Sequence, residues 1–162
     1  MPKSQLAHDL LKISEDLVAS AKPRQANLKR AISTAYYALF HCLSESCANH
    51  FIGKKKNGRA AWRQTYRALQ HGFAKKACDS VNDSKQRKIL EKFPDEIQDF
   101  ALQFYNMQIK RHEADYDPYS RYRKSQVLAD ISATREVIRA FEAAPTSDRR
   151  AFAALVLFQR RD

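Results

Sequence analysis

The sequence predicts an all-α protein, and three observations lead to that fold class. The chain has 162 residues, 44% of them hydrophobic, which suits one well-filled core better than two. Only 3 glycines and 5 prolines occur, and β-branched residues do not alternate with polar ones over any long stretch. Apolar residues instead recur every three or four positions, as on one face of a helix. We therefore expect one domain, residues 1–162, folded as an antiparallel up-and-down bundle of four to five helices with a short C-terminal helix.

Pro23 separates the first two predicted helices. The first covers residues 4–20, and the second begins near Gln25 and runs to a lysine loop between Gly53 and Gly58. The expected apolar seam of the first helix is Leu6, Leu10, Ile13 and Leu17. The apolar stripe of the second is Leu28, Ile32, Tyr36, Phe40, Leu43 and Cys47. The length of this stripe makes the second helix the predicted centre of the bundle.

A third helix is predicted over residues 59–77, although Gly72 weakens its last turn. Its stripe is Trp62, Tyr66, Leu69 and Phe73. Residues 80–84 resemble a turn, and residues 84–93 fit a short helical piece. These expectations place a helix, a turn and a short helical piece between the lysine loop and Pro94.

The C-terminal third predicts three further helical segments. Pro94 starts a helix that the Asp117–Pro118 pair ends. The next helix carries Val127, Ile131, Thr134, Ile138 and Phe141. After Pro145, a cap at Thr146 or Ser147 would begin a last short helix. That helix contains Phe152, Leu155, Val156 and Phe158, and we expect residues 143–162 to form an appended tail.

Positive charge is concentrated in one quarter of the chain. The formal net charge is +11, and residues 53–92 hold twelve Lys or Arg against three Asp or Glu, so they carry nine of the excess charges. Six cations cluster at the start of this segment: Lys54, Lys55, Lys56, Arg59, Arg63 and Arg67. Because the arginines recur every four residues, they share a helix face that could follow a phosphate backbone, which favours RNA as partner. The alternative is a merely solvated basic face, with Trp62 and Tyr66 filling the core.

Cysteine use and hydropathy indicate the compartment. Three cysteines form no CxxC pair, and Cys42 and Cys47 point apart on one helix, which indicates reduced thiols and a cytoplasmic location. No segment approaches the roughly 18 apolar residues of a membrane span, and the N-terminus has no apolar signal-peptide core. We expect neither export nor a membrane.

Most enzyme motifs are absent. The sequence has no phosphate-binding glycine loop, no HExxH and no GxSxG elbow, and its five histidines form no ligand pair with cysteines. We therefore predict no metal site and no cofactor. Tyr37 and His41 lie on the flank of the central helix as secondary candidates, with a core or interface role for His41 as the alternative to catalysis.

The fourth long helix ends in ionisable residues. Its apolar stripe, Ile97, Phe100, Phe104 and Met107, continues onto Arg111, with Asp115 one turn ahead. Either the two form a structural ion pair, or Arg111 serves a site. Metal-free RNA cleavage needs a cation for the phosphate and groups that move two protons. Arg111 could supply the cation, and His112, Asp115 or Tyr116 could move protons.

Two segments resemble the signature segments of small prokaryotic HEPN-domain proteins. They are residues 31–41 (AISTAYYALFH) and 111–118 (RHEADYDP), which resemble the pair written RAYYAxFH and RxxADY. The resemblance covers about residues 5–143. It implies a bundle of four or five helices, a homodimer with facing arginine motifs, and either a metal-independent RNase of toxin–antitoxin or phage-defence systems or a non-catalytic partner of a nucleotidyltransferase.

The chain departs from the catalytic HEPN pattern at the histidine. That pattern is Arg, four to six residues, then His, and no Arg–His pair here has this spacing. After four intervening residues from Arg111 the chain has Tyr116, a phenol with an ordinary pKa of about 10 and thus a poor base at neutral pH. His112 is rotated by about 100° around the helix from Arg111.

Two functions therefore remain open. In the first, the protein is an RNase or toxin whose expression inhibits growth until Arg111 is replaced by alanine. In the second, the same surface binds a nucleotide, RNA or an acidic protein such as an antitoxin without catalysis, and the Arg111–Asp115 pair supports the fold.

Overall fold

The computed structural model describes residues 4–161, and it confirms the all-α prediction. Eight α-helices and one short 3₁₀ turn account for the regular structure, and this part of the chain has no strand. The helices are α1 (Gln5–Leu17), α2 (Gln25–Phe51), α3 (Arg59–Ala68), α4 (His71–Ala77), α5 (Ser84–Leu90), α6 (Asp95–Tyr116), α7 (Lys124–Ala143) and α8 (Thr146–Leu157). The 3₁₀ turn η1 covers Lys56–Gly58.

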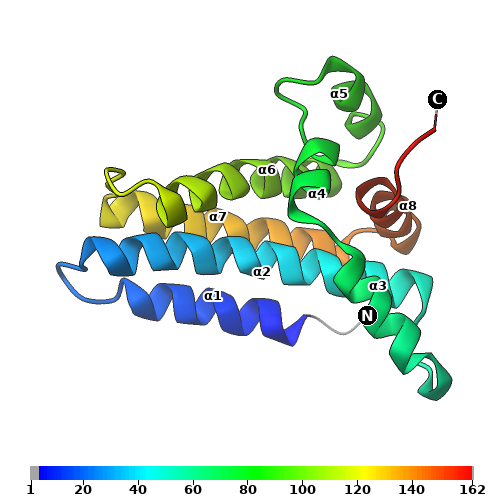
Figure 1. Cartoon of the computed structure of the whole chain (residues 1–162), viewed down its shortest axis with the longest axis horizontal. Coiled ribbons are helices and arrows are strands. Elements are labelled where there is room, and N and C mark those ends of the chain that lie inside the picture. Colours follow the sequence, from blue (N-terminus) through cyan, green and yellow to red (C-terminus); the bar gives the residue numbers. More distant parts are fainter. Residues whose placement is uncertain (1–3, 162) are drawn as a thin grey trace.

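Four long helices form the bundle. Figure 1 shows α1, α2, α6 and α7 side by side, each running opposite to the one before it along the chain. The central helix is α2, which contacts α1, α3, α6, α7 and α8. Its small residues Ala31, Ala35 and Ala38 are fully buried, so neighbouring helices can approach its backbone closely. The predicted up-and-down bundle with a central second helix is therefore what the chain forms.

Helix α1 is rotated from the predicted orientation. Leu6 and Ile13 of the predicted seam are 46% and 50% exposed. The side of α1 that faces the core is formed by Ala7, Leu11, Ser14 and Val18. Polar contacts fix this rotation, because the Ser14 hydroxyl donates to the Ala31 carbonyl at 2.7 Å and the His8 ring meets the Glu142 carboxylate of α7 at 3.0 Å. Leu10 and Leu17 pack against the core as partly buried side chains, so the seam prediction was right at these two positions and wrong at Leu6 and Ile13.

The predicted third helix is two helices. The backbone is extended at Leu69 (ψ 124°) and Gln70 (ψ 131°), which ends α3 and lets α4 start in a new direction. Leu69 is buried at this break, so the chain turns where it places an apolar side chain in the core. No glycine or proline marks the position, and Gly72 lies inside α4 without a close neighbour. The sequence therefore had no local signal for the break.

Helices α6 and α7 match their predictions. Asp95 follows the N-cap Pro94, and α6 ends at Tyr116, directly before the Asp117–Pro118 pair. The predicted stripes of both helices are buried, and the Phe100 ring of α6 stacks on Phe141 of α7 at 4.2 Å between centroids. This packing carries the buried face of α6 forward to Arg111.

The last helix is part of the core. Phe152 of α8 is fully buried and contacts the rings of Phe93, Phe100 and Phe141. Neither Thr146 nor Ser147 caps the helix: the N-cap is Pro145, with no side-chain cap bond. The Arg149 side chain instead donates to the Ala144 carbonyl at 3.0 Å, which ties the first turns of α8 to the end of α7. Within residues 4–161, no helix has the length and apolar character needed to cross a bilayer.

Replacement of Phe152 by alanine tests the role of α8. We expect the free energy of unfolding to fall by about 3–5 kcal/mol, because the change leaves a cavity among three aromatic rings. Phe158→Ala is the matched control, since that ring is 57% exposed and its loss should cost about 1 kcal/mol or less. Urea unfolding of both variants gives the comparison, and equal losses would contradict a core role for α8.

Candidate functional site

Arg111 lies inside the bundle, where its permanent charge requires compensation. The residue is only 9% exposed. Its guanidinium lies 3.6 Å from the Asp115 carboxylate one helical turn ahead. The central carbon of the guanidinium is 5.1 Å from the centre of the Tyr36 ring and 6.0 Å from the centre of the Tyr37 ring, and both tyrosines belong to α2. A carboxylate and two aromatic faces together offset the cost of burying the charge.

Asp115 connects this buried cation to α2 and to the surface. One of its carboxylate oxygens accepts a hydrogen bond from the Ser33 hydroxyl at 3.3 Å, and the same oxygen faces Arg111. We call Ser33, Tyr36, Tyr37, His71, Arg111 and Asp115 the Arg111 cluster. Through it, α2 and α6 are joined by polar contacts as well as by core packing.

His112 and Tyr116, the other two candidates on α6, lie apart from the Arg111 cluster. Both are exposed, and their rings contact each other at 4.9 Å between centroids. The helical geometry accounts for this, because positions one and five residues after Arg111 project from a different side of α6. Of the four predicted residues, the structure thus brings together only Arg111 and Asp115.

Sequence reasoning missed His71, which the fold brings to the Arg111 cluster. Its Nδ1 lies 2.6 Å from the Tyr36 hydroxyl, and its ring stacks on Phe40 at 4.0 Å between centroids. Burial lowers the pKa of His71, and the positive charge of Arg111 and the nearby His41 lower it further. In the sequence, His71 was recognisable only as a histidine within the predicted third helix. The break before α4 sets the direction of its side chain, and no local signal predicts that break.

The chemistry of Tyr36 indicates which ring nitrogen of His71 carries the proton. Burial raises the pKa of Tyr36 well above its ordinary value, although Arg111 opposes the shift. The phenol therefore keeps its proton, and because Arg111 can only donate, the Tyr36 hydroxyl donates to Nδ1 of His71. The neutral His71 ring then carries its proton on Nε2. In this state His71 is a hydrogen-bond donor at Nε2 and has no free basic nitrogen.

A second tyrosine–histidine pair connects α3 to α2. Nδ1 of His41 lies 2.5 Å from the Tyr66 hydroxyl. Burial raises the pKa of Tyr66 to about 12 and lowers that of His41, so the phenol donates to a neutral ring. Tyr37, the other secondary candidate, lies with its ring 5.9 Å from that of His71. His41 thus fits an interface role between helices, and Tyr37 belongs to the Arg111 cluster.

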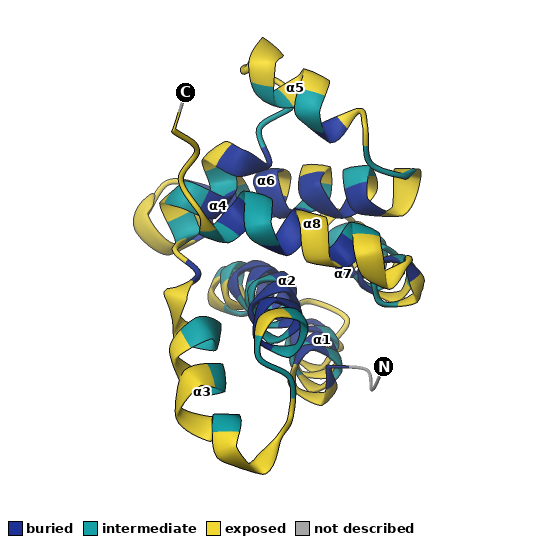
Figure 2. Ribbon diagram, turned by 90° about the vertical axis from the view of Figure 1, so that its right-hand side faces the viewer, coloured by how far each residue is buried: buried dark blue, intermediate teal, exposed yellow. Residues whose placement is uncertain are grey.

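The six clustered cations lie on a separate element, which we call the basic arm (residues 53–70, comprising η1, α3 and their flanking loops). All six are exposed, and α3 has no buried residue. Figure 2 shows α3 standing off the bundle beside α2. Trp62 and Tyr66 are half-buried, and the Trp62 ring nitrogen donates to the Asn49 side chain of α2 at 2.9 Å. These two aromatics attach the arm to α2; they are not part of the hydrophobic core.

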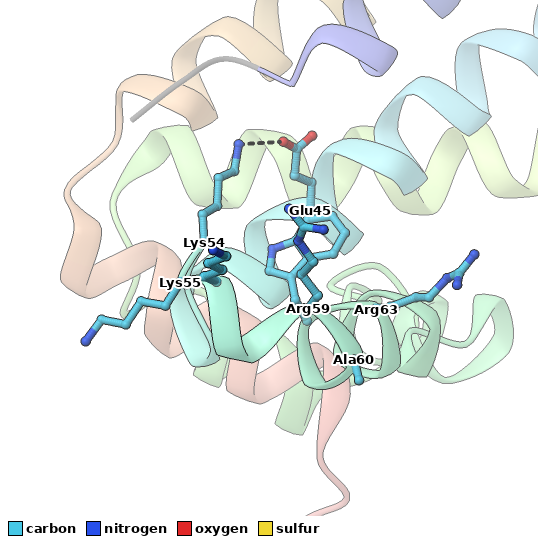
Figure 3. Close-up of a pocket in the computed structure, with 9 residues that line it drawn as sticks. Glu45, Lys54, Lys55, Arg59, Ala60 and Arg63 are labelled. Carbon is cyan, nitrogen blue, oxygen red and sulfur yellow. Dashed lines mark ion pairs between the residues drawn. The ribbon is translucent and has the colours of Figure 1, made fainter.

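An open hollow of about 810 Å³ lies between the basic arm and α2. Its lining residues are Glu45, Gly53, Lys54, Lys55, Lys56, Arg59, Ala60, Trp62 and Arg63. Figure 3 shows Lys54 reaching toward Glu45, while Lys55 and Arg63 point away from that carboxylate. A second hollow along the outside of α3 is lined by Arg63 and Arg67. The arm therefore presents its positive charge around concave surfaces.

The charge-rich segment of the sequence does not form one continuous surface. Helix α5, with Lys85, Arg87 and Lys88, lies on the opposite side of the molecule from α3 (Figures 1 and 2). The Arg87 side chain is also engaged by two carbonyls, those of Ser80 and Val81. The concentration of charge relevant to a single ligand is thus the basic arm.

The described residues near the arm and the Arg111 cluster include neither a metal-binding group nor a reactive thiol. Within residues 4–161, no three His, Cys, Asp or Glu side chains are arranged to hold a metal ion. The three cysteines are free and buried, and burial raises the pKa of Cys47 to about 12. These thiols are therefore poor nucleophiles.

Comparison of the chain with protein-family models, with curated proteins and with solved structures gives no match. Membership of the HEPN superfamily stays a prediction that rests on the two sequence segments. In the fold these segments contact each other, through Ser33 with Asp115 and Tyr36 with Arg111.

A structural role for Arg111 predicts a loss of stability when it is replaced. Arg111→Ala should lower the free energy of unfolding by about 2 kcal/mol, because it removes the cation between two tyrosines and a carboxylate. His112→Ala, at the exposed neighbouring position, should change it by no more than about 0.5 kcal/mol. Urea unfolding followed by circular dichroism measures both, and an Arg111→Ala protein as stable as wild type would contradict the role.

Partly buried, neutral histidines predict a loss of stability in mild acid. Burial lowers the pKa values of His41, His50 and His71 in the folded state. In the unfolded chain their pKa returns to about 6.5, so the unfolded state takes up protons first as the pH falls. The stabilisation is therefore complete above about pH 6.5 and is lost as the pH falls toward the folded-state pKa values.

Unfolding measured between about pH 7.5 and about pH 5.5 checks this direction. Because His71→Gln removes one of the three groups, the free energy of unfolding of this variant should depend less steeply on pH than that of wild type. Stability that rises on acidification over this range would contradict the assignment of neutral, partly buried rings.

Proposed function

We propose that the chain is an RNA-associated protein of the HEPN type that binds single-stranded RNA along its basic arm. The observation that carries the proposal is the arm itself: six exposed cations on an element whose helix buries no residue. Folding does not require these charges to be there, because they make no contribution to the core. Their spacing around two hollows suits a flexible, negatively charged chain.

The position of Arg111 supports binding more than cleavage. At 9% exposure its guanidinium has little surface for a phosphate, and Asp115 already faces it. His71, the histidine of the Arg111 cluster, has its Nδ1 engaged by Tyr36. In this proposal the Arg111 cluster holds α2, α4 and α6 together, and the basic arm contacts the RNA.

Removal of charge from the arm tests the proposal. The triple variant Lys55→Gln, Arg59→Gln, Arg63→Gln should weaken binding of single-stranded RNA of any sequence. It should also reduce the slope of log affinity against log salt by about two, since each phosphate contact contributes about 0.7. Fluorescence anisotropy of labelled RNA from about 50 mM to about 200 mM salt measures both quantities.

A matched control removes the same charge elsewhere. Lys85→Gln, Lys88→Gln, Lys92→Gln changes three exposed lysines in and after α5, on the opposite side of the molecule. This variant should keep the wild-type affinity and nearly the wild-type salt slope. Equal weakening by the two triple variants would show that net charge alone attracts RNA, and no binding by wild type would refute the proposal.

A second candidate function is metal-independent RNA cleavage, favoured by one observation. Arg111 and His71 both contact the Tyr36 side chain, so a cation and a proton donor come near each other although the sequence lacks the standard spacing. Cleavage needs such a cation at the phosphate and an acid for the leaving oxygen, together with a base for the 2′-hydroxyl.

Incubation of labelled RNA with the protein in EDTA decides between the candidates. If the Arg111 cluster cleaves RNA, products appear in EDTA and are lost in His71→Ala and in Arg111→Lys, which keeps the positive charge. His112→Ala, outside the cluster, should then retain the activity. RNA that stays intact while it binds would refute cleavage and leave the binding function in place.

The partner proteins expected from the HEPN resemblance belong to this proposal as well. An acidic antitoxin would compete with RNA for the basic arm, and a homodimer or a nucleotidyltransferase would use another face. The half-exposed Leu6 and Ile13 of α1 provide apolar surface away from the arm. The cytoplasmic location inferred from cysteine use is part of the same proposal.

A further inference from the structure

The hollow between the basic arm and α2 combines three kinds of group. Cations come from the loop after α2 and from α3, a carboxylate comes from Glu45 on α2, and an indole comes from Trp62 on α3. Its volume, about 810 Å³, falls within the range typical of small-molecule sites. The hollow thus offers a single ligand positive charge, an aromatic surface and a hydrogen-bond acceptor.

Trp62 is held as a rigid platform at this hollow. Its ring nitrogen donates to Asn49, and the Tyr66 ring lies 5.2 Å away at an interplanar angle of 31°. One edge of the indole is therefore bound to α2, and one side of it packs against an aromatic neighbour. A nucleobase that entered the hollow could stack on the remaining surface of the indole, as bases do on aromatic side chains in single-strand binding sites.

Glu45 lies close to this platform and has unused hydrogen-bonding capacity. It stands four residues before Asn49, hence about one helical turn along α2 from the group that holds Trp62. Its side chain is 19% exposed, and its one ion pair, with Lys54, is long at 3.9 Å. Among the described residues no hydrogen bond reaches its carboxylate. Both oxygens can therefore accept from a ligand.

We propose that this hollow binds a guanine base of a nucleotide or of single-stranded RNA. The base stacks on Trp62, its N1–H and N2–H groups donate to the Glu45 carboxylate, and its phosphate contacts the cations of the arm. Lys55 and Arg63, which point away from Glu45, lie where the adjoining phosphates of an RNA strand would run (Figure 3). This inference rests on the proposed RNA-binding function and adds a base preference to it.

The donor pattern of the bases decides in favour of guanine. A carboxylate only accepts hydrogen bonds, and its two oxygens match two adjacent N–H donors. Guanine presents such a pair on its Watson–Crick edge. The single N–H of uracil lies between two carbonyl oxygens, which a carboxylate repels. Adenine and cytosine each present one amino group beside an acceptor, so they gain at most half of the contact.

The single tryptophan of the chain gives a direct reading of the site. Because Trp62 is the one tryptophan in the sequence, quenching of the tryptophan emission reports on this hollow. We would titrate the full chain with GMP, AMP, CMP and UMP, and with short oligomers of uridine that contain one guanosine or none. Guanine-containing ligands should quench the fluorescence saturably and bind about tenfold or more tightly than their uracil counterparts.

Two matched variants isolate the carboxylate. Glu45→Gln keeps the shape of the side chain but replaces one acceptor by a donor, so the guanine preference should fall to about twofold or less while uridine oligomers bind at least as well. Glu136→Gln makes the same change at an exposed position of α7 and should leave the preference unchanged. Circular dichroism verifies that both variants are folded.

The outcomes separate this inference from the proposed function. RNA binding without guanine preference, without quenching, or with a preference that survives Glu45→Gln would overturn the guanine site and leave RNA binding intact. No binding of any RNA would overturn both. Saturation by GMP alone would support the site with a free nucleotide as sufficient ligand, and saturation only by the oligomer would support it with RNA as the ligand.

Discussion

The bundle depends on how it accommodates one buried cation. A guanidinium at the end of the apolar stripe of α6 cannot lose its charge, so the fold must supply compensation around it. Asp115 provides a carboxylate, and Tyr36 and Tyr37 provide ring faces. Since the two tyrosines belong to α2 and Tyr36 also binds His71 of α4, the requirement of one charge fixes the relative position of three helices.

The basic arm differs from the Arg111 cluster in physical character. The cluster has Ser33, Tyr36 and Arg111 buried at its centre, and its polar groups contact one another, which suits a supporting role. The arm buries no residue in α3, is attached through two aromatic side chains and one long ion pair, and exposes all six of its clustered cations. A surface that adds little to stability yet concentrates charge around a hollow is better explained by a ligand than by folding.

The sequence predicted the fold class, the central helix and the Arg111–Asp115 pair, because these depend on helical periodicity and on i,i+4 spacing. It failed where a single tertiary contact outweighs periodicity. The contact of Ser14 with Ala31 goes with a rotation of α1 that exposes Leu6 and Ile13, and the burial of Leu69 breaks the third predicted helix without a glycine or proline. His71 was missed for the same reason, since its position follows from that break. The hollow beside Glu45 could not be foreseen, because it depends on the direction that α3 takes after the loop that follows α2.

Hydrogen exchange of the full chain with and without single-stranded RNA tests the central claim most directly. We propose that the basic arm contacts the ligand and that the Arg111 cluster supports the fold. RNA should therefore slow exchange in residues 53–70 and leave residues 108–117 nearly unchanged. Slowed exchange around Arg111 with an unchanged arm would contradict the account, because it would place the ligand at the buried cation.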